Sequence, residues 1–424
     1  MSTIELASAQ SRSRPQAAWR QPPRLPVLFL IADTGGGHRS AALAVGQALD
    51  RLYPGQFGPV LCDPLGGPGS ARLLRWVTGL YGPAIRLAPW LWGAAYHATD
   101  SRAAAALLRR TLLRLAQRPV LTAALAHRPA AVVSFHPLTG AAAVAARDRA
   151  APGSPAVTVV TDLARTHAAW RSGRADLIVG LPAGPGAAGG SPRLPCGPPV
   201  TRDFWSGPLR HGHERAALRR SLGVPGDRFL VLLTGGGEGS GGIGRRAAAI
   251  LRRLPDVDMV AVCGRNRGLR RRLDRLAAGS GGRLTVTGFS RDMADWLRCC
   301  DLVVTKAGPG TIAEATCCGA PLLLTSHVPG QERGNAEYVT RAGAGRRARR
   351  VRRMLADIED LRADREHLAA MRAASAGLGG PGAAAAIAQA IAGLVGAGAA
   401  GAENTGAARA AAEPAGGAGR EHRC

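Results

Sequence analysis

The stretch LIADTGGGHRSAALAVGQAL, residues 30–49, decides the fold class of this 424-residue chain. It begins as an apolar strand, passes through three consecutive glycines and His38, and leaves as an alanine-rich helix. Glycine lets the chain turn tightly and lets another group come close to the backbone. A strand, a glycine loop and a helix in this order are typical of an α/β unit, and the loop is a candidate binding site.

The same alternation of strand and helix occurs in both halves of the chain. Buried strands are predicted at 26–31, 130–135, 156–161 and 175–179, and again at 228–234, 259–264, 284–289, 301–308 and 321–325. Helical stretches such as 39–52 and 101–117 lie between them. Because helices connect successive strands, the sheets are expected to be parallel. We therefore predict an α/β fold with two Rossmann-like domains that face each other across a cleft.

Composition sets the expected domain boundaries. The N-terminus has no apolar stretch long enough for a signal peptide, and a run rich in Pro and Gly divides the two α/β patterns. The predicted parts are a disordered N-terminus (1–24), a first domain (25–180), a linker (181–205), a second domain with terminal helices (206–394) and a disordered Gly/Ala-rich tail (395–424).

The charge of the chain favours an anionic partner. There are 55 Lys and Arg residues against 29 Asp and Glu, which gives a formal net charge of +26. No nucleic-acid-binding motif accompanies this charge, so we expect anionic lipid and phosphate as partners and no nucleic acid. We find no charge-free run of about 18 apolar residues and expect no transmembrane helix. The eight cysteines lack the spacing of a metal site.

A second glycine loop, TGGGEGSGGIGRR (234–246), follows the first strand of the second half. Backbone N–H groups of such a loop, together with the start of the next helix, can hold a diphosphate. Six of the eight residues 235–242 are glycine, which favours phosphate contact over a plain tight turn. The loop lacks the GK[ST] of a P-loop. NAD is the weaker alternative, because no acidic residue closes the next strand.

The segment DLVVTKAGPGTIAEATCCGAPLLLTSHVPGQERGNAEYV (301–339) carries further candidates. Lys306 is the only lysine in the chain, which suggests that a compact ammonium is needed there. GPGT opens a helix whose N-terminus is a second anion site. Glu314 on that helix can accept both hydroxyls of a ribose, or makes only a favourable charge–dipole contact. Gln331 and Glu332, in a polar loop, can bind sugar hydroxyls.

Together these motifs resemble the donor domain of family-28 glycosyltransferases. The matching stretches are GF (288–289), Met293, DLVVTKAGPGTIAEA (301–315), GAP (319–321), PGQERGN (329–335) and GAG (343–345). The first half is similar to one branch, the monogalactosyldiacylglycerol synthases and bacterial processive diacylglycerol glucosyltransferases, in DTGGGHRSAA (33–42), SFHPL (134–138), TVVTDLARTHAAW (158–170) and CGPPVTRDFW (196–205). The resemblance implies the GT-B fold and a UDP-sugar donor.

The resemblance also implies roles for individual residues, with the second domain binding the donor and the first binding the acceptor. The implied donor-binding residues are Gly235, Gly236 and Gly237 at the diphosphate, Gly288 and Phe289 at the uracil, Glu314 at the ribose, and Gln331 and Glu332 at the sugar, with Lys306, Gly310, Thr311 and Asn335 beside them. The chain departs from the family in two places. Ala168 stands where the family has proline, which leaves the acceptor open, and 346–353 is unusually rich in arginine.

An inverting transfer needs a base that takes the proton of the acceptor hydroxyl. His38 is the first candidate, because an imidazole has a pKa near neutrality. The alternative is that His38 only caps the helix that follows it. Asp162 and His136 both follow strands and are the other candidates for the base.

The segment 73–100 is expected to face the membrane or the lipid acceptor. It holds Trp76, Trp90 and Trp92 with interleaved arginines, a composition that suits a bilayer interface. An ordinary buried helix pair is the alternative, although Pro83 and Pro89 interrupt the helical periodicity. Gly35, Gly36 and Gly37 are expected to line the cleft on the acceptor side.

The sequence therefore predicts an inverting hexosyltransferase that moves a sugar from a UDP-sugar to a lipid hydroxyl, with diacylglycerol favoured. It is expected to be peripheral, on the cytoplasmic face of the cell membrane. No metal or other cofactor is expected, and DVD (256–258) is interpreted as loop charge. The alternatives are a transferase for a polyprenyl-diphosphate-linked sugar or a soluble natural product, and a non-catalytic binding protein of the same descent.

Overall fold

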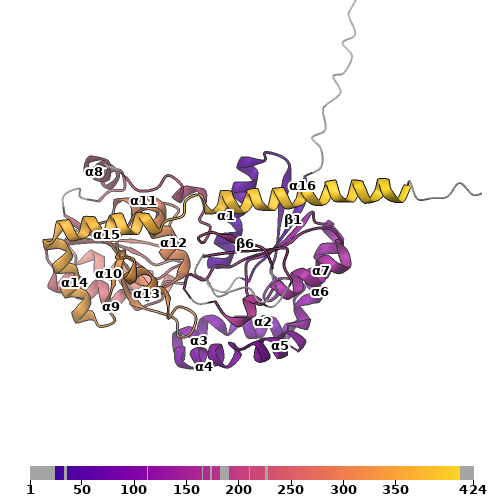
Figure 1. Ribbon diagram of the computed structural model, residues 1–424. Helices are drawn as coiled ribbons and strands as arrows, with labels where there is room; N and C mark the ends of the chain where they lie inside the picture. The colour runs from indigo at the N-terminus through magenta and orange to yellow at the C-terminus, as the bar shows by residue number, and fades with distance from the viewer. Residues whose placement is uncertain are drawn as a thin grey trace, which may run out of the picture.

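The computed structural model describes residues 24–32, 36–111, 113–164, 166–171, 174–181, 191–209, 211–224 and 228–410. These residues form two α/β domains, each built on a six-stranded parallel sheet covered by helices (Figure 1). The predicted fold class, two Rossmann-like domains with parallel sheets, is confirmed.

The first sheet has the strand order β2-β1-β3-β4-β5-β6. Its strands are β1 (Leu25–Leu30), β2 (Phe57–Cys62), β3 (Ala131–Ser134), β4 (Ala156–Val159), β5 (Leu177–Gly180) and β6 (Arg193–Pro195). Its helices are α1 (Gly37–Leu52), α2 (Arg72–Gly79), α3 (Tyr81–Leu87), α4 (Pro89–Thr99), α5 (Arg102–Arg110), α6 (Arg114–His127) and α7 (Gly140–Ala150), with short 3-10 turns η1 (Ala168–Arg171) and η2 (Arg202–Phe204).

The second sheet has the strand order β12-β11-β10-β7-β8-β9. Its strands are β7 (Phe229–Thr234), β8 (Val257–Val262), β9 (Leu284–Thr287), β10 (Leu302–Lys306), β11 (Leu322–Ser326) and β12 (Gly345–Arg347). The helices of this half are α8 (Gly212–Ser221), α9 (Ile243–Arg253), α10 (Arg267–Ala278), α11 (Met293–Cys299), α12 (Pro309–Cys317), α13 (Asn335–Arg341), α14 (Val351–Ala363), α15 (Arg365–Leu378) and α16 (Ala383–Ala410).

The strands that the apolar runs predicted are present, and three others, β2, β6 and β12, were missed. β7, FLVLLT, is buried along its whole length, as a strand covered on both faces should be. β2, β6 and β12 each contain Pro, Gly or Arg and lack such a run. β6 lies inside the predicted linker 181–205, so part of that segment belongs to the first sheet.

Helix α16 crosses from the second domain to the first (Figure 1). Ala384, Ile387, Ala388 and Ile391 are fully buried in the core of the first domain, beside α1. The sequence assigned them to the second domain, but their spacing of three and four residues gives one apolar helix face that packs on the first. The helix also continues through 395–410, where a tail without regular structure was predicted, because alanine favours helix.

One helical stretch among the described residues, Arg365–Ala397, is long and apolar enough to cross a membrane by length and composition. The expectation that the chain holds no such run was therefore wrong. The run consists mainly of Ala and Gly, with the isoleucines on the face that packs against the first domain. This contact accounts for the isoleucine face of α16, whereas only 28% of the apolar window is buried.

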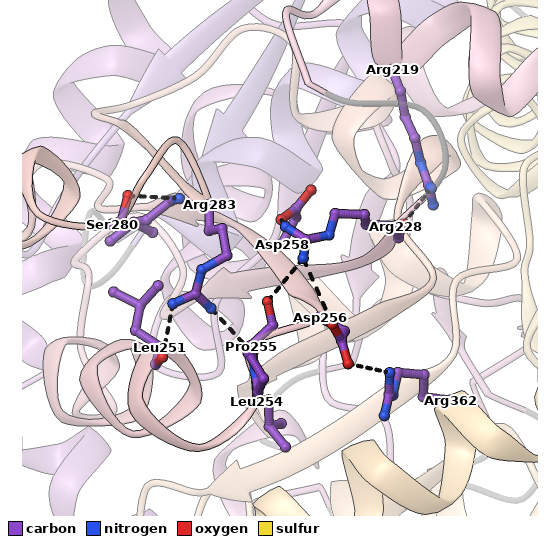
Figure 2. Close-up of polar contacts among 11 residues, drawn as sticks. Arg219, Arg228, Leu251, Leu254, Pro255, Asp256, Asp258, Ser280, Arg283 and Arg362 are labelled. Atoms are coloured by element: carbon purple, nitrogen blue, oxygen red, sulfur yellow. Dashed lines mark hydrogen bonds and ion pairs between the residues drawn. The ribbon is translucent and has the colours of Figure 1, made fainter.

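The acidic pair Asp256 and Asp258 belongs to an ion-pair network rather than to a loop of free charge. Asp258 lies in β8 and is buried, and its Oδ1 is 3.4 Å from Nη1 of Arg228. Asp256 pairs with Arg362 at 3.3 Å, and Figure 2 shows these side chains meeting at one place. Because the pair stands at the amino end of β8, opposite the loops that follow the strands, it lies on the far edge of the sheet from the glycine loop.

We expect Ile387→Ala to lower the free energy of unfolding by about 2–5 kcal/mol, because it leaves a cavity in the first-domain core. Urea unfolding followed by circular dichroism measures this. Gln389→Ala, at an exposed position of the same helix, is the control and should change stability by less than about 0.5 kcal/mol. Equal and small effects of both variants would show that α16 does not pack on the first domain.

Candidate active site

The first candidate site lies where the strand order of the first, all-parallel sheet reverses. From β1 the chain goes to β2 on one side, and from β3 it goes to β4 on the other. Loops after such neighbouring strands diverge and leave a crevice at the carboxyl edge of the sheet, where α/β proteins bind ligands. His38 follows β1, His136 follows β3, and Asp162 follows β4. The fold thus brings together the three predicted candidates for the base.

His38 is held in the first turn of α1 by two contacts. Its Nδ1 lies 2.8 Å from the carbonyl oxygen of Phe135 and 3.2 Å from Oγ1 of Thr161. A carbonyl oxygen only accepts, so Nδ1 carries the proton and Nε2 keeps its lone pair. The residue before α1, Gly36, has φ 84°, and no side chain caps the helix. The alternative that His38 serves as a helix cap is therefore not what the structure shows.

Burial sets the protonation of the two histidines. It lowers the pKa of His38 to about 4, although the bond to Phe135 raises it. Burial, and then the charge of His38, hold the pKa of His136 well below its ordinary value. The two rings meet edge to face with centroids 4.6 Å apart. The Nδ1 of His136 accepts the N–H of Leu138 at 3.2 Å, so its remaining nitrogen is a donor rather than a base.

Asp162 is the third ionisable group of this crevice. Burial raises the pKa of its carboxyl to about 7, and the negative charges of Glu332 and Asp100 add to this. The Nε1–H of Trp170 donates to its Oδ2 at 2.6 Å and opposes the rise. Glu332 belongs to the second domain, so a carboxylate of that domain adds to the charge around Asp162.

The second candidate site lies at the equivalent reversal of the second sheet, between β7 and β10. The glycine loop follows β7, and several of its glycines are required by the loop itself. A side chain on Gly235 would overlap the backbone of Ser240, and one on Gly239 would overlap that of Cys263. A side chain on Gly236 would approach Lys306 instead, with 3.9 Å to Cε. Gly236 and Gly241, whose added Cβ would lie 3.7 Å from Cβ of Lys306, are thus both next to the lysine.

The start of α12 completes this second crevice. Pro309 is its first residue, no side chain caps it, and a Cβ added at Gly310 would meet nothing within 4 Å. As in the first turn of any helix, the N–H groups of Gly310 and Thr311 have no partner within α12, and they lie at its positive end. Burial raises the pKa of the Glu314 carboxyl to about 7. A desolvated carboxylate of this kind is stabilised when ligand hydroxyls donate to it.

The loop before α13 holds the predicted sugar-binding residues in different ways. Glu332 is buried; its Oε1 pairs with Nζ of Lys306, and its Oε2 accepts the N–H of Val328 at 2.8 Å. Both of its oxygens thus have protein partners. Asn335 donates to the carbonyl of Ala307 at 2.9 Å and ties α13 to the loop after β10. Gln331 faces the first domain, where the hydroxyl of Tyr81 lies 3.5 Å from its Oε1.

The remaining predicted residues lie in loops of the second domain, at the start of α1 or outside the described residues. Phe289 is 69% exposed, and a Cβ at Gly288 would lie 3.2 Å from Nη1 of Arg270. A Cβ at Gly37 would meet nothing within 4 Å. Gly35 lies outside the described residues. Gly237 accepts the backbone N–H of Arg265 at 2.8 Å.

Three residues of the site carry no sequence motif and were missed. Arg265 pairs with Glu238 at 2.9 Å, and its Nη2 would lie 3.4 Å from a Cβ at Gly36, across the gap between the domains. Tyr81 reaches Gln331. Ser326 has a buried hydroxyl without a hydrogen-bond partner among the described residues. Among those same residues, no three His, Cys, Asp or Glu side chains gather closely enough to hold a metal ion.

The aromatic segment 73–100 has two faces. Trp76 and Trp90 are 65% and 72% exposed, and Leu87 is 84% exposed. Trp92, predicted to face the same way, instead turns inward and meets Tyr81 edge to face at 4.8 Å. The exposed apolar residues of α2, α3 and α4 are Leu73, Trp76, Val77, Leu80, Leu87, Trp90 and Leu91. Exposed large apolar side chains gathered in one segment are typical of an interaction surface.

Known proteins with the same motifs identify the family. A model of the glycosyltransferase family 28 C-terminal domain matches residues 230–389. A probable chloroplastic monogalactosyldiacylglycerol synthase 2 of Oryza sativa subsp. indica is 33% identical over 341 residues, covering 75% of this chain and 70% of the rice protein. Monogalactosyldiacylglycerol synthase 3 of Arabidopsis thaliana is 30% identical over 348 residues, which cover 75% of this chain and 70% of the Arabidopsis protein.

Solved structures confirm the fold. MurG of Acinetobacter baumannii has a TM-score of 0.54 at 18% identity, over 87% of this chain and 99% of that one. Sucrose-phosphate synthase of Thermosynechococcus elongatus has a TM-score of 0.56 at 16% identity, over 88% of this chain and 100% of the synthase. The predicted family is thus confirmed: the chain belongs to glycosyltransferase family 28, in the branch of the monogalactosyldiacylglycerol synthases, and is a glycosyltransferase with the GT-B fold.

Proposed function

We propose that this glycosyltransferase moves a hexose from a UDP-sugar to a lipid hydroxyl, with diacylglycerol as acceptor, and inverts the anomeric centre. The observation that carries the proposal is the meeting of the two crevices, where Gly36 faces Arg265 and Tyr81 faces Gln331. A base and an anion site from different domains then flank one space. The names of the relatives, monogalactosyldiacylglycerol synthases, support the lipid acceptor and make UDP-galactose the first donor to test.

The donor is held by the second domain in this proposal. The diphosphate lies against the N-terminus of α12, Gly236 and Lys306, where helix dipole and ammonium both oppose its charge. Glu332 keeps Lys306 directed into the crevice. Glu314, partly buried on α12, accepts the ribose hydroxyls. The positive groups stabilise UDP as it leaves, so no metal ion or other cofactor takes part.

The transfer is a single displacement. The acceptor oxygen attacks the anomeric carbon as the bond to UDP breaks, and the acceptor proton passes to a base. We assign this base to Nε2 of His38, which keeps a free lone pair at the mouth of α1. Burial lowers the pKa of His38 to about 4, and the negative charge of a bound diphosphate raises it toward neutrality. Asp162 instead receives the Trp170 N–H and orders the loop beside the acceptor.

The exposed face of α2, α3 and α4 docks on an anionic membrane in this proposal, so the enzyme is peripheral. Trp76, Leu87 and Trp90 enter the interface. The net charge of +26 supplies long-range attraction, with about 1 kcal/mol for each basic residue close to the surface. We place the enzyme on the cytoplasmic face of the cell membrane. Docking there brings the acceptor headgroup to the crevice that holds His38.

The first prediction concerns the base. His38→Ala should lower kcat by about 10²-fold or more, with little change in UDP affinity. Because kcat/KM reports the free enzyme, and His38 is deprotonated above pH about 4, kcat/KM should be flat between pH 6 and 8. Asp162, with a pKa of about 7, would act only when ionised. If it were the base, kcat/KM would fall about tenfold per pH unit below 7, and Asp162→Asn would lose activity at every pH.

The second prediction concerns substrates and metal. Liposomes that contain diacylglycerol, incubated with the enzyme, UDP-galactose or UDP-glucose and EDTA, should yield a monohexosyl lipid detectable by mass spectrometry. Activity that disappears in EDTA and returns with Mg²⁺ would contradict the metal-free site. Transfer only to soluble acceptors or to polyprenyl-linked sugars would contradict the lipid acceptor, and absence of transfer to any acceptor would contradict catalysis.

The third prediction concerns the membrane. The wild type should sediment with anionic liposomes strongly at low salt and partly at high salt, because salt screens charge but not apolar burial. Replacing both Trp76 and Trp90 by Ala should weaken the binding at high salt by about tenfold or more, since burying each large side chain is worth about 1.5–3 kcal/mol. Leu125→Ala, an exposed position on α6, is the control and should bind like the wild type. Unchanged binding of the double variant would place the membrane surface elsewhere.

A further inference from the structure

Helix α4 of the aromatic segment 73–100 packs directly against the loop before α13, which we call the donor loop (residues 327–334). A Cβ on Gly93 of α4 would lie 2.7 Å from Cβ of Pro329, and a Cβ on Gly330 would lie 2.6 Å from the ring of Tyr96. Both distances are too short for any larger residue. The two glycines therefore permit direct contact between a helix of the first domain and the loop that carries Gln331.

Tyr81 occupies the centre of this contact. Its ring packs edge to face against Trp92, at 4.8 Å between centroids, and its hydroxyl donates to Oε1 of Gln331 at 3.5 Å. The Nε1–H of Trp92 is itself buried without a hydrogen-bond partner among the described residues. A buried donor left in this way beside a binding crevice is available to a ligand.

The charges around Tyr81 come from three separate loops. Burial raises the pKa of its phenol above the ordinary value, and the negative charges of Glu332, Asp162 and Glu238 add to this. These residues belong to the donor loop, the loop beside the candidate base and the glycine loop, respectively. Tyr81 thus stands where the two crevices join, and its hydroxyl remains protonated and able to donate.

We propose that Tyr81 is a positioning residue of the donor-sugar subsite, which acts by orienting the side-chain amide of Gln331. When Oε1 of Gln331 accepts the Tyr81 hydroxyl, the NH₂ group of the amide is left to donate to a hexose hydroxyl. The inference rests on the proposed function, in which Gln331 faces the hexose of a UDP-sugar. It adds that a residue of the acceptor domain, on the segment with the exposed tryptophans, fixes the sugar contact of the donor domain.

UDP and UDP-hexose separate this role from a structural one, because only UDP-hexose carries the hydroxyls that Gln331 would bind. Tyr81→Phe removes the hydroxyl and keeps the ring against Trp92. It should weaken binding of UDP-galactose or UDP-glucose about 3–10-fold, the loss expected for one hydrogen bond. Binding of UDP should stay within about twofold of the wild type. Titration calorimetry on the full chain, without acceptor, measures both.

A double-mutant cycle assigns the effect to Gln331. In a Gln331→Ala background, Tyr81→Phe should cause no further loss of UDP-hexose affinity, because the amide it orients is gone. Tyr53→Phe is the matched control; this tyrosine packs on Phe57, away from the site, and its loss of a hydroxyl should change neither affinity.

The outcomes distinguish the two proposals. If the wild type binds UDP-hexose and Tyr81→Phe binds it equally well, the positioning role is wrong and the proposed function stands. Equal losses for UDP and UDP-hexose, or an undiminished loss in the Gln331→Ala background, also overturn the positioning role. If the wild type binds neither UDP nor UDP-hexose, the proposed function fails, and the inference fails with it.

Discussion

Parallel strands deliver the loops that follow them to one edge of a sheet, and in this protein two such edges face each other. In each sheet the strand order reverses once, between β1 and β3 in the first sheet and between β7 and β10 in the second. Because the two edges face each other, the ionisable groups of the first crevice lie opposite the helix N-terminus of the second. Two connections maintain this arrangement: α16, which returns from the second domain into the core of the first, and the contact of α3 and α4 with the loop that carries Gln331.

Desolvation governs the chemistry available in this cleft. It moves the pKa of His38 down to about 4 and those of Asp162 and Glu314 up to about 7, so at neutral pH His38 is uncharged and the two carboxyls are only partly ionised. Neutral groups cost little to bury without a ligand. A bound diphosphate favours protonation of His38, whereas hydroxyl donors favour ionisation of Glu314. In the proposed mechanism, binding of the donor and acceptor thus creates the charges that the transfer uses.

The sequence predicts what depends on local pattern and on strand order. The apolar run of β7 shows a buried parallel strand, and because His38, His136 and Asp162 each follow a strand, topology alone predicts that they gather. Contacts between distant segments carry no such signal. Trp90 and Trp92 differ by two positions, yet one is exposed and the other meets Tyr81, because the packing of α4 on the second domain decides between them. Tyr81 and Gln331, 250 residues apart, belong to no common motif.

Ala168, where the chain departs from the family pattern, lies beside the end of α4 and makes a hydrogen bond there. The backbone N–H of Ala168 donates to Oδ1 of Asp100, just past the end of α4, at 2.8 Å. Proline has no N–H and cannot make this bond. Beside it, Oγ1 of Thr99 lies 3.2 Å from Nε2 of His167. The end of α4 is thus tied to the loop of Asp162, while its inner face rests on the donor loop. Ala168 therefore supplies a backbone hydrogen bond to the end of α4 that a proline at this position could not make.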